Sequence, residues 1–207
     1  MEKKVQNKRV KRTLALLEQS LAELMKEKKP DAITVKELTQ HANLNRGTFY
    51  LHYKDIDDLL EQVVSGKIDT LLEIIRTNYP PDSSSSYYHM FLEVLRYLKE
   101  NQNVCLTIFL NPSSPAMQRF RQELKHREES ELESYYGKDN IPEYNYFLTF
   151  ATTGAIGVME QWMNSTHEST LETIAKMLDD FVCGGRASLF GRTSISHIYT
   201  TAYHPMR

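Results

Sequence analysis

The stretch HANLNRGTFYLHYKD, residues 41–55, concentrates hydrogen-bond donors beside aromatic rings. Four donors fall within about two and a half helical turns: Arg46, Tyr50, His52 and Lys54. Phe49 and Tyr53 add apolar surface. An active site, a metal site, a structural core helix and a nucleic-acid reader could each combine such groups, so the surrounding elements must decide among them.

The charge of the chain is unevenly distributed. Residues 1–54 contain twelve Lys or Arg and six Asp or Glu, whereas the remaining residues contain thirteen and twenty-one. A basic head on an acidic body suits a polyanion-binding module joined to a part that does not touch the polyanion. Ordinary surface variation explains the same numbers, so composition leaves both interpretations open.

The composition is that of an ordinary globular protein, with 207 residues, 41% hydrophobic and 25% charged. No apolar run reaches the roughly 18–20 residues of a membrane helix. The basic N-terminus lacks the apolar segment of a signal peptide, so we expect a cytoplasmic protein that does not bind membranes. Cys105 and Cys183 belong to no CxxC pair, and we expect free thiols and no metal site.

The hydrophobic periodicity predicts helices from the N-terminus onward. One apolar stripe predicts a first helix of about five turns: Val10, Leu14, Leu17, Leu21 and Leu24. Thr34 and Glu37 form a capping box that predicts a second, short helix. Asn43 tolerates the left-handed conformation of a tight turn, and Asn45 would cap a third helix that continues to about His52.

Asp55 would cap a fourth helix, and the segment NYPPDSSSS (residues 78–86) then interrupts the helical pattern. Helical segments resume at about 87–100, 102–110, 116–136, 144–164 and 170–190. Strand-like alternation is absent from the sequence. These patterns predict an all-α protein.

The segments TVKELTQHA and NRGTFYLHY, joined by a tight turn, have the spacing of a helix-turn-helix. Its small core would contain Leu38, Ala42, Leu44 and Phe49. Arg46 and Thr48 would then face base edges, and Gly47 would let the backbone approach DNA. Phosphate contacts would come from Tyr50, His52 and Lys54, while Lys36 could also reach the groove. Taken alone, His52 is more often a structural or surface histidine than a ligand.

The sequence ITVKELTQHANLNRGTFYLHYKDIDDLL resembles the N-terminal DNA-binding domain of the TetR/AcrR family of bacterial transcriptional regulators. The resemblance covers roughly residues 8–75. It implies a homodimer that places two helix-turn-helix motifs in successive major grooves of a palindromic operator. The candidate DNA-binding residues are Thr34, Lys36, Asn45, Arg46, Thr48, Tyr50, Leu51, His52 and Lys54. Among them, the resemblance implies that Leu51, like Lys36, Arg46 and Thr48, faces bases.

Two positions depart from the family pattern. Asn43 stands where the family usually has Gly, and Ile56 stands where a second phosphate-binding Lys is common. With Ile56 in place of this lysine, the resemblance implies one fewer contact with the DNA phosphate backbone. The basic segment KKVQNKRVKR at the N-terminus could be an arm that adds salt-sensitive phosphate affinity, and a disordered tail is an equal alternative.

Residues 87–190 resemble the C-terminal domain of one branch of the same family, on the segments FLEVLRYLKENQNVCLTIFL and YFLTFATTGAIGVMEQWMN. The resemblance implies that the last two long helices form a dimeric four-helix bundle. The candidate dimer residues are Gly154, Gly157, Val158, Trp162, Ile174, Met177, Leu178 and Phe181. Burial inside one protomer is the alternative for the same residues.

A small-molecule effector would bind an apolar cavity in this second domain, although aromatic residues at helical spacing are more often plain core. The candidate lining residues are Phe91, Leu95, Cys105, Phe109, Phe120, Leu124, Tyr146 and Phe150. No cofactor is implied, and no arrangement typical of an enzyme is legible.

The expected organisation has four parts: a DNA-binding domain at 1–56, a connecting helix and linker at 57–86, a ligand-binding and dimerisation domain at 87–190, and a tail at 191–207. The tail is either disordered or packed on the partner. The expected function is a repressor released from its operator by an inducer. The alternative is an activator or co-regulator whose C-terminal domain binds a partner protein.

Overall fold

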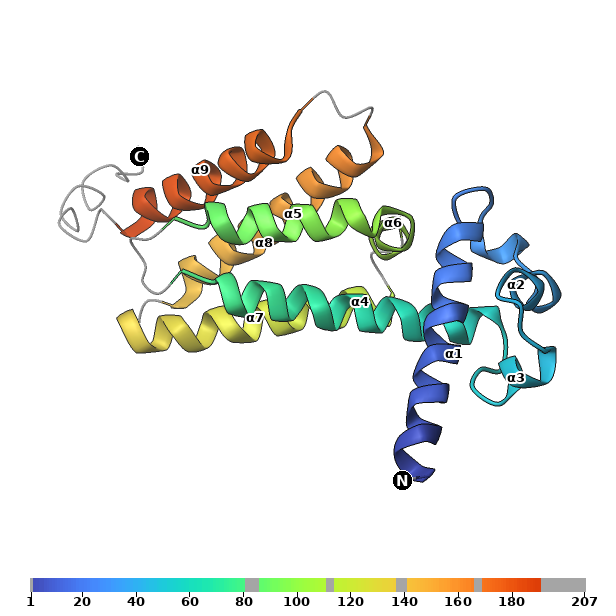
Figure 1. Cartoon of the computed structure of the whole chain (residues 1–207). Coiled ribbons are helices and arrows are strands. Elements are labelled where there is room, and N and C mark those ends of the chain that lie inside the picture. The colour runs from blue at the N-terminus through green and yellow to red at the C-terminus, as the bar shows by residue number, and fades with distance from the viewer. Residues whose placement is uncertain (1, 81–85, 111–113, 137–140, 166–168, 191–207) are drawn as a thin grey trace, which may run out of the picture. The chain divides into compact units, whose positions relative to one another are not determined.

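The computed structural model describes every residue except 1, 81–85, 111–113, 137–140, 166–168 and 191–207. The expected tail, 191–207, therefore lies outside the described residues. Those residues that are described form helices and no strands (Figure 1), which confirms the all-α prediction. The elements are α1 (Glu2–Leu24), η1 (Pro30–Ala32), α2 (Val35–His41), α3 (Arg46–Tyr50), α4 (Ile56–Asn78), α5 (Tyr88–Glu100), α6 (Gln102–Leu110), α7 (Pro115–Tyr136), α8 (Ile141–Asn164) and α9 (Leu171–Phe190).

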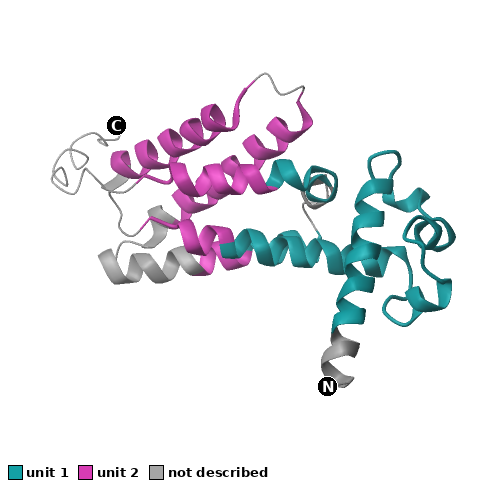
Figure 2. Ribbon diagram, in the orientation of Figure 1, with its two compact units in different colours: residues 1–73, 98–121 teal, residues 74–97, 122–207 magenta. Residues whose placement is uncertain are grey.

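The chain divides into two compact units (Figure 2). Unit 1 comprises residues 1–73 and 98–121, and unit 2 comprises residues 74–97 and 122–207. Helices α4, α5 and α7 contribute residues to both units. The described part of the chain contains no helix long and apolar enough to cross a membrane.

The core of unit 1 forms around the apolar stripe of α1. Leu17 and Leu21 are fully buried, whereas Val10 and Leu14 are half-buried. Burying such side chains supplies about 1.5–3 kcal/mol each. An ion pair of 2.8 Å between the Lys67 ammonium and the Glu18 carboxylate links α4 to α1 across the edge of this core.

Unit 2 contains α8 and α9, which lie side by side (Figure 1). Phe147 and Leu148 of α8 are buried and pack with the half-buried Ala151 and Val182. The approach of the two helices is close at Gly185, because an added Cβ there would lie 2.7 Å from the Phe147 ring. An alanine at this position would therefore have to displace the Phe147 ring.

A buried carboxylate joins α9 to the start of α5 within unit 2. Asp179, 6% exposed, accepts hydrogen bonds from the Tyr87 backbone N–H at 2.8 Å and from the Ser86 hydroxyl at 2.9 Å. The Arg186 guanidinium donates to the Tyr87 hydroxyl at 2.6 Å and lies over the same ring. The Ser86 hydroxyl in turn accepts from the Tyr88 N–H at 3.1 Å, so Asp179 and Ser86 together satisfy two backbone N–H groups at the start of α5.

Candidate nucleic-acid interface

The first helix of the motif, α2, begins at a side-chain cap. The Thr34 hydroxyl accepts a hydrogen bond from the Glu37 backbone N–H at 3.3 Å. The Glu37 carboxylate pairs with the Lys28 ammonium, which lowers the pKa of that carboxyl, and the Thr34 backbone N–H lowers it further. The predicted capping box is present, with its carboxylate shared with a lysine that precedes the helix.

The turn between α2 and α3 is a Schellman motif. The Leu44 N–H donates to the Thr39 carbonyl at 2.9 Å, and the Asn43 N–H donates to the Gln40 carbonyl at 3.1 Å. Asn43 has φ 51°, which confirms the predicted left-handed residue. Asn therefore performs the role of the glycine that is usual at this position.

The second helix of the motif, α3, begins at the predicted cap, because the Asn45 side-chain oxygen accepts from the Gly47 N–H at 2.8 Å. The helix ends at Tyr50, two residues before the predicted limit at His52. The Phe49 carbonyl accepts from both His52 and Tyr53 N–H groups, at 2.9 and 3.0 Å. This tight turn leads the chain into α4. The hydrophobic periodicity predicted one continuous helix to about His52 and therefore did not indicate the turn.

Aromatic side chains hold α3 in place. Phe49 is fully buried and Tyr53 is 8% exposed, with ring centroids 5.7 Å apart. Leu38 and Ala42 of the preceding helix end are also buried, and Leu44 is half-buried. The predicted small core is therefore present.

The start of α4 fixes the segment that follows α3. The Asp55 carboxylate accepts from the Asp58 N–H at 2.8 Å, as predicted for a cap, and the Asp58 carboxylate accepts from the Lys54 N–H at 2.9 Å. The Lys54 N–H lowers the pKa of the Asp58 carboxyl. Sequence reasoning missed the role of Asp58, although an acid three residues after a capping Asp was its signal. Ile56, the departure from the family pattern, is buried.

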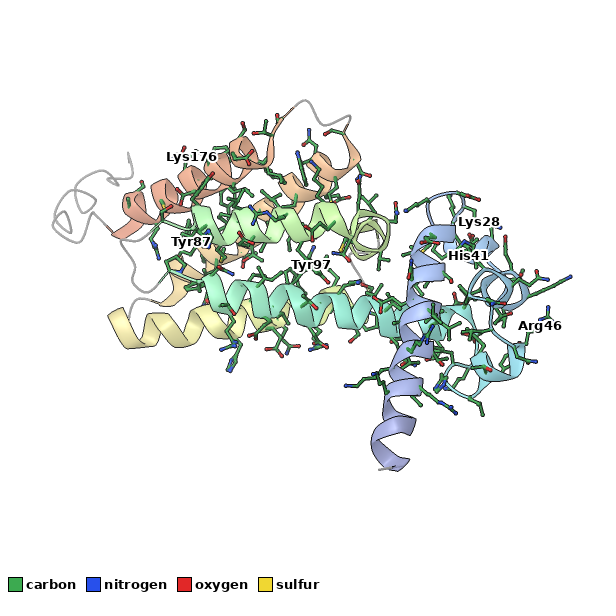
Figure 3. All side chains as sticks on the ribbon, viewed as in Figure 1. Lys28, His41, Arg46, Tyr87, Tyr97 and Lys176 are labelled. Atoms are coloured by element: carbon green, nitrogen blue, oxygen red, sulfur yellow. The ribbon has the colours of Figure 1, made fainter. Side chains whose placement is uncertain are left out.

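The candidate DNA-binding side chains largely face solvent. Tyr50 is 59% exposed and Leu51 is 79% exposed. Thr34, Lys36, Asn45, Arg46 and Lys54 are also exposed, whereas Thr48 and His52 are half-buried. Figure 3 labels Arg46 at α3, and it labels His41 at the end of α2. The structure thus separates exposed donors from buried aromatics.

The basic N-terminal segment belongs to α1, which begins at Glu2. A disordered tail therefore does not describe it, and an arm that contacts phosphates would be helical. No Pro or Gly interrupts residues 2–24, so helix formation continues from the buried half of α1 towards the N-terminus. Lys8, Arg9, Lys11 and Arg12 are exposed on this helix.

The candidate ligand-pocket residues occupy different environments. Phe91 and Leu95 are buried in unit 2, and Cys105 and Phe120 are buried in unit 1. Leu124 is half-buried, and the side chain of Phe109 lies outside the described residues. Tyr146 and Phe150 face solvent, 79% and 75% exposed. Burial raises the pKa of the Cys105 thiol to about 12.

The candidate dimer residues also divide by burial. Trp162, Ile174 and Leu178 are buried within the protomer. Val158 and Met177 are half-buried, whereas Gly154, Gly157 and Phe181 are exposed. An added Cβ at either of these two glycines would meet nothing within 4 Å. The chain itself therefore does not require glycine at Gly154 or Gly157.

A short capped helix, a left-handed turn and a second capped helix with outward donors define a helix-turn-helix protein of the DNA-binding class. The family model "Bacterial regulatory proteins, tetR family" matches residues 19–63, and "Transcriptional regulator C-terminal region", a TetR C-terminal model, matches residues 85–184. Together these ranges cover more than half of the chain. The chain belongs to the TetR family of bacterial regulators and is a DNA-binding transcriptional regulator.

Solved structures share this fold. A TetR transcriptional regulator from Streptococcus agalactiae 2603V is 24% identical, with a TM-score of 0.59, over 86% of this chain and 97% of that chain. The dihydroxyacetone kinase operon activator DhaS is 19% identical, with a TM-score of 0.59, over 83% and 94%. FadR from Bacillus subtilis in complex with stearoyl-CoA is 14% identical, with a TM-score of 0.62, over 83% and 98%. A comparison with curated proteins found no match.

Proposed function

We propose that the protein is a homodimeric repressor that binds a palindromic operator and leaves it when a small-molecule inducer binds. In this proposal residues 1–56 bind DNA, residues 57–86 connect, and residues 87–190 bind the inducer and form the dimer. The observation that carries it is the division of α3 and its flanks into a buried aromatic side and an exposed donor side.

The proposed roles follow from side-chain chemistry. Arg46 and Thr48 read base edges, because a guanidinium can form a bidentate pair with guanine and a threonine offers both a hydroxyl and a methyl. Tyr50, His52 and Lys54 bind phosphates, which position the helix without reading sequence. The exposed Lys36 contributes from α2, and the exposed cap residues Thr34 and Asn45 complete the set.

The exposed cations of α1 extend the proposed phosphate contacts. Lys8, Arg9, Lys11 and Arg12 face solvent on a helix. Log affinity falls as log salt concentration rises, and each phosphate contact made by such a cation would make this slope more negative by about 0.9. The basic turns of α1 would therefore raise affinity for any DNA and leave operator choice unchanged.

The proposed dimer seam follows the solvent-facing side of α8. Tyr146 and Phe150 are among the most exposed large hydrophobic residues described, and Gly154 and Gly157 follow at helical spacing. The stripe carries no charge. Glycines with open space beside them permit a second helix to approach closely. Phe181, 60% exposed on α9, would join this surface.

The proposed inducer is apolar, because the candidate lining residues that are buried in unit 2, Phe91 and Leu95, are aromatic and aliphatic. FadR, which resembles this chain in fold, was solved with stearoyl-CoA. The second candidate function is activation, which the similarity to the operon activator DhaS supports. Deleting the gene would raise expression of the target promoter if the protein represses it and lower that expression if it activates.

DNA binding is tested by selecting bound sequences from random duplex DNA with the full-length protein, followed by gel shifts at one fixed salt concentration. The double variant Arg46→Ala/Tyr50→Ala should lose more than about 100-fold in operator affinity, because it loses one base contact and one phosphate contact. Lys99→Ala, which removes an exposed cation outside the motif, is the matched control and should change affinity less than about twofold. Equal effects of both variants would sink the proposal.

Dimer formation is tested by filling the open glycine position on α8. An added Cβ at the exposed Gly157 meets nothing within 4 Å of the chain, so we expect Gly157→Leu to leave the protomer folded, and a loss of association then reports the partner. Gly66→Leu on α4 is the matched control, because it is equally open in the chain and exposed. Sedimentation should show a monomer for the first variant and a dimer for the second. A dimer for both would place the seam elsewhere.

A further inference from the structure

Leu51 is an exposed hydrophobic side chain that the fold does not use. It is 79% exposed, so its side chain contributes little to the core of unit 1. The backbone around it is fixed by other groups, because the Phe49 carbonyl binds the two N–H groups that follow Leu51 and Asp58 binds the N–H of Lys54. An alanine at this position would preserve the turn.

Leu51 lies at the C-terminal end of α3, on the side opposite the buried Phe49. Its φ of −74° and ψ of −17° continue the helical path of α3. Leu51 is therefore about 160° around the helix axis from the buried Phe49 and about 40° from Gly47. Gly47 carries no side chain, so Leu51 projects beside bare backbone at the centre of the outward face.

The surroundings of Leu51 identify the kind of partner. Among the described side chains of unit 1, the exposed large hydrophobics are Tyr50 and Leu51, which are adjacent. Arg46 and Lys54 are exposed cations on either side of them in sequence. A protein partner could bind Leu51 through an apolar surface without using these cations. A nucleic acid supplies phosphates that pair with Arg46 and Lys54, so it fits the whole patch.

The apolar group that a base edge presents in the major groove is the C5 methyl of thymine. We propose that Leu51 reads one thymine in each operator half-site by packing on this methyl group. The proposal rests on the proposed DNA-binding function and adds a specific base to it. It assigns sequence discrimination to an apolar contact, in addition to the polar contacts of Arg46.

The test removes only the methyl group. Each thymine of the selected operator is replaced in turn by uracil in both half-sites, and affinity is measured by gel shift at fixed salt. Wild-type protein should lose about fourfold per half-site at one position. Leu51→Ala should bind thymine and uracil operators equally at that position, whereas Leu51→Met, which retains an apolar side chain, should keep most of the discrimination.

The outcomes separate this proposal from the function on which it rests. Equal uracil effects in wild type and Leu51→Ala at every thymine, or no uracil effect in wild type, would overturn the role of Leu51. If Arg46→Ala still abolished selective binding in that experiment, the DNA-binding function would stand. A selection that enriched no sequence would overturn both.

Discussion

The helix-turn-helix of unit 1 and the α8–α9 pair of unit 2 reach order by different means. Helices α2 and α3 have seven and five residues. Isolated helices shorter than about 12–15 residues are marginal in water, so these two depend on their caps and on the small core of Leu38 and Phe49. Helices α8 and α9 have 24 and 20 residues and pack through apolar faces.

The difference lies in the sequence distance between interacting groups. Thr34 with Glu37, Asn45 with Gly47 and Asp55 with Asp58 are partners two or three residues apart. In unit 2, Asp179 binds a backbone N–H 92 residues earlier in the chain. Local partners leave a pattern in the sequence, whereas distant partners do not.

The largest effect that would sharpen this comparison comes from the core of the motif. Phe49→Ala should lower the free energy of unfolding of unit 1 by about 4 kcal/mol, because Phe49 is fully buried. Tyr50→Ala is the matched control at the next residue, and its loss should be about 1 kcal/mol or less, since Tyr50 is 59% exposed and meets Phe49 edge to face. Urea unfolding measures both, and equal losses would contradict the assigned sides of α3.

The distant bonds of unit 2 can be broken at Asp179. Asp179→Ala should cost about 2 kcal/mol, because the Tyr87 N–H and the Ser86 hydroxyl lose their buried acceptor. Asp179→Asn keeps a carbonyl oxygen for one of these donors, and it should cost about half as much. Thermal unfolding compares the two variants. A neutral Asp179→Ala would show that water replaces the carboxylate without loss.

Adjacent glycines on α9 test how closely α8 and α9 approach. Gly185→Ala should destabilise the protein by about 1 kcal/mol, because the new methyl group displaces the Phe147 ring and this overpacking exceeds the helical gain. Gly184→Ala has open space and should stabilise the helix by up to about 1 kcal/mol. Melting temperatures should therefore move in opposite directions. Shifts of the same sign would mean that the helices adjust freely.

The smallest expected effect distinguishes the two cysteines. Burial raises the pKa of Cys105 in unit 1 to about 12, and burial also raises the pKa of Cys183, whose thiol donates to Asp179. At pH 8, iodoacetamide should label the half-buried Cys183 before the fully buried Cys105. The unfolded chain in urea is the control and should show no such order.

The same raised pKa has a consequence for stability. The folded pKa of the Cys105 thiol, about 12, lies above its value in the unfolded chain. The contribution of this thiol to the free energy of unfolding is therefore fully present below the unfolded pKa, and it is lost as the pH rises towards 12. Unfolding measured between pH 8 and pH 11 should show this loss in wild type and less of it in Cys105→Ala. An unchanged pH dependence in that variant would contradict the assignment.

Much of the fold was predictable because its signals are local. The five helices from α5 to α9 begin within three residues of the predicted starts, and the caps at Thr34, Asn45 and Asp55 are all present. The early end of α3 and the helical N-terminus were not predicted. The early end of α3 depends on the turn that leads into α4. The helical N-terminus depends on α1 continuing towards the N-terminus beyond its buried leucines.

The amino-acid sequence by itself determined the all-α class, the capped helix-turn-helix and the separation of Phe49 and Tyr53 from the donors, because helical period and capping act over a few residues. Only the tertiary structure decided which apolar side chains of the long helices are internal. Tyr146 and Phe147 are neighbours of similar chemistry, yet the first is 79% exposed and the second is 8% exposed. An α-helix in contact with several surfaces carries apolar residues on more than one face, and the neighbours that cover each face come from distant parts of the chain.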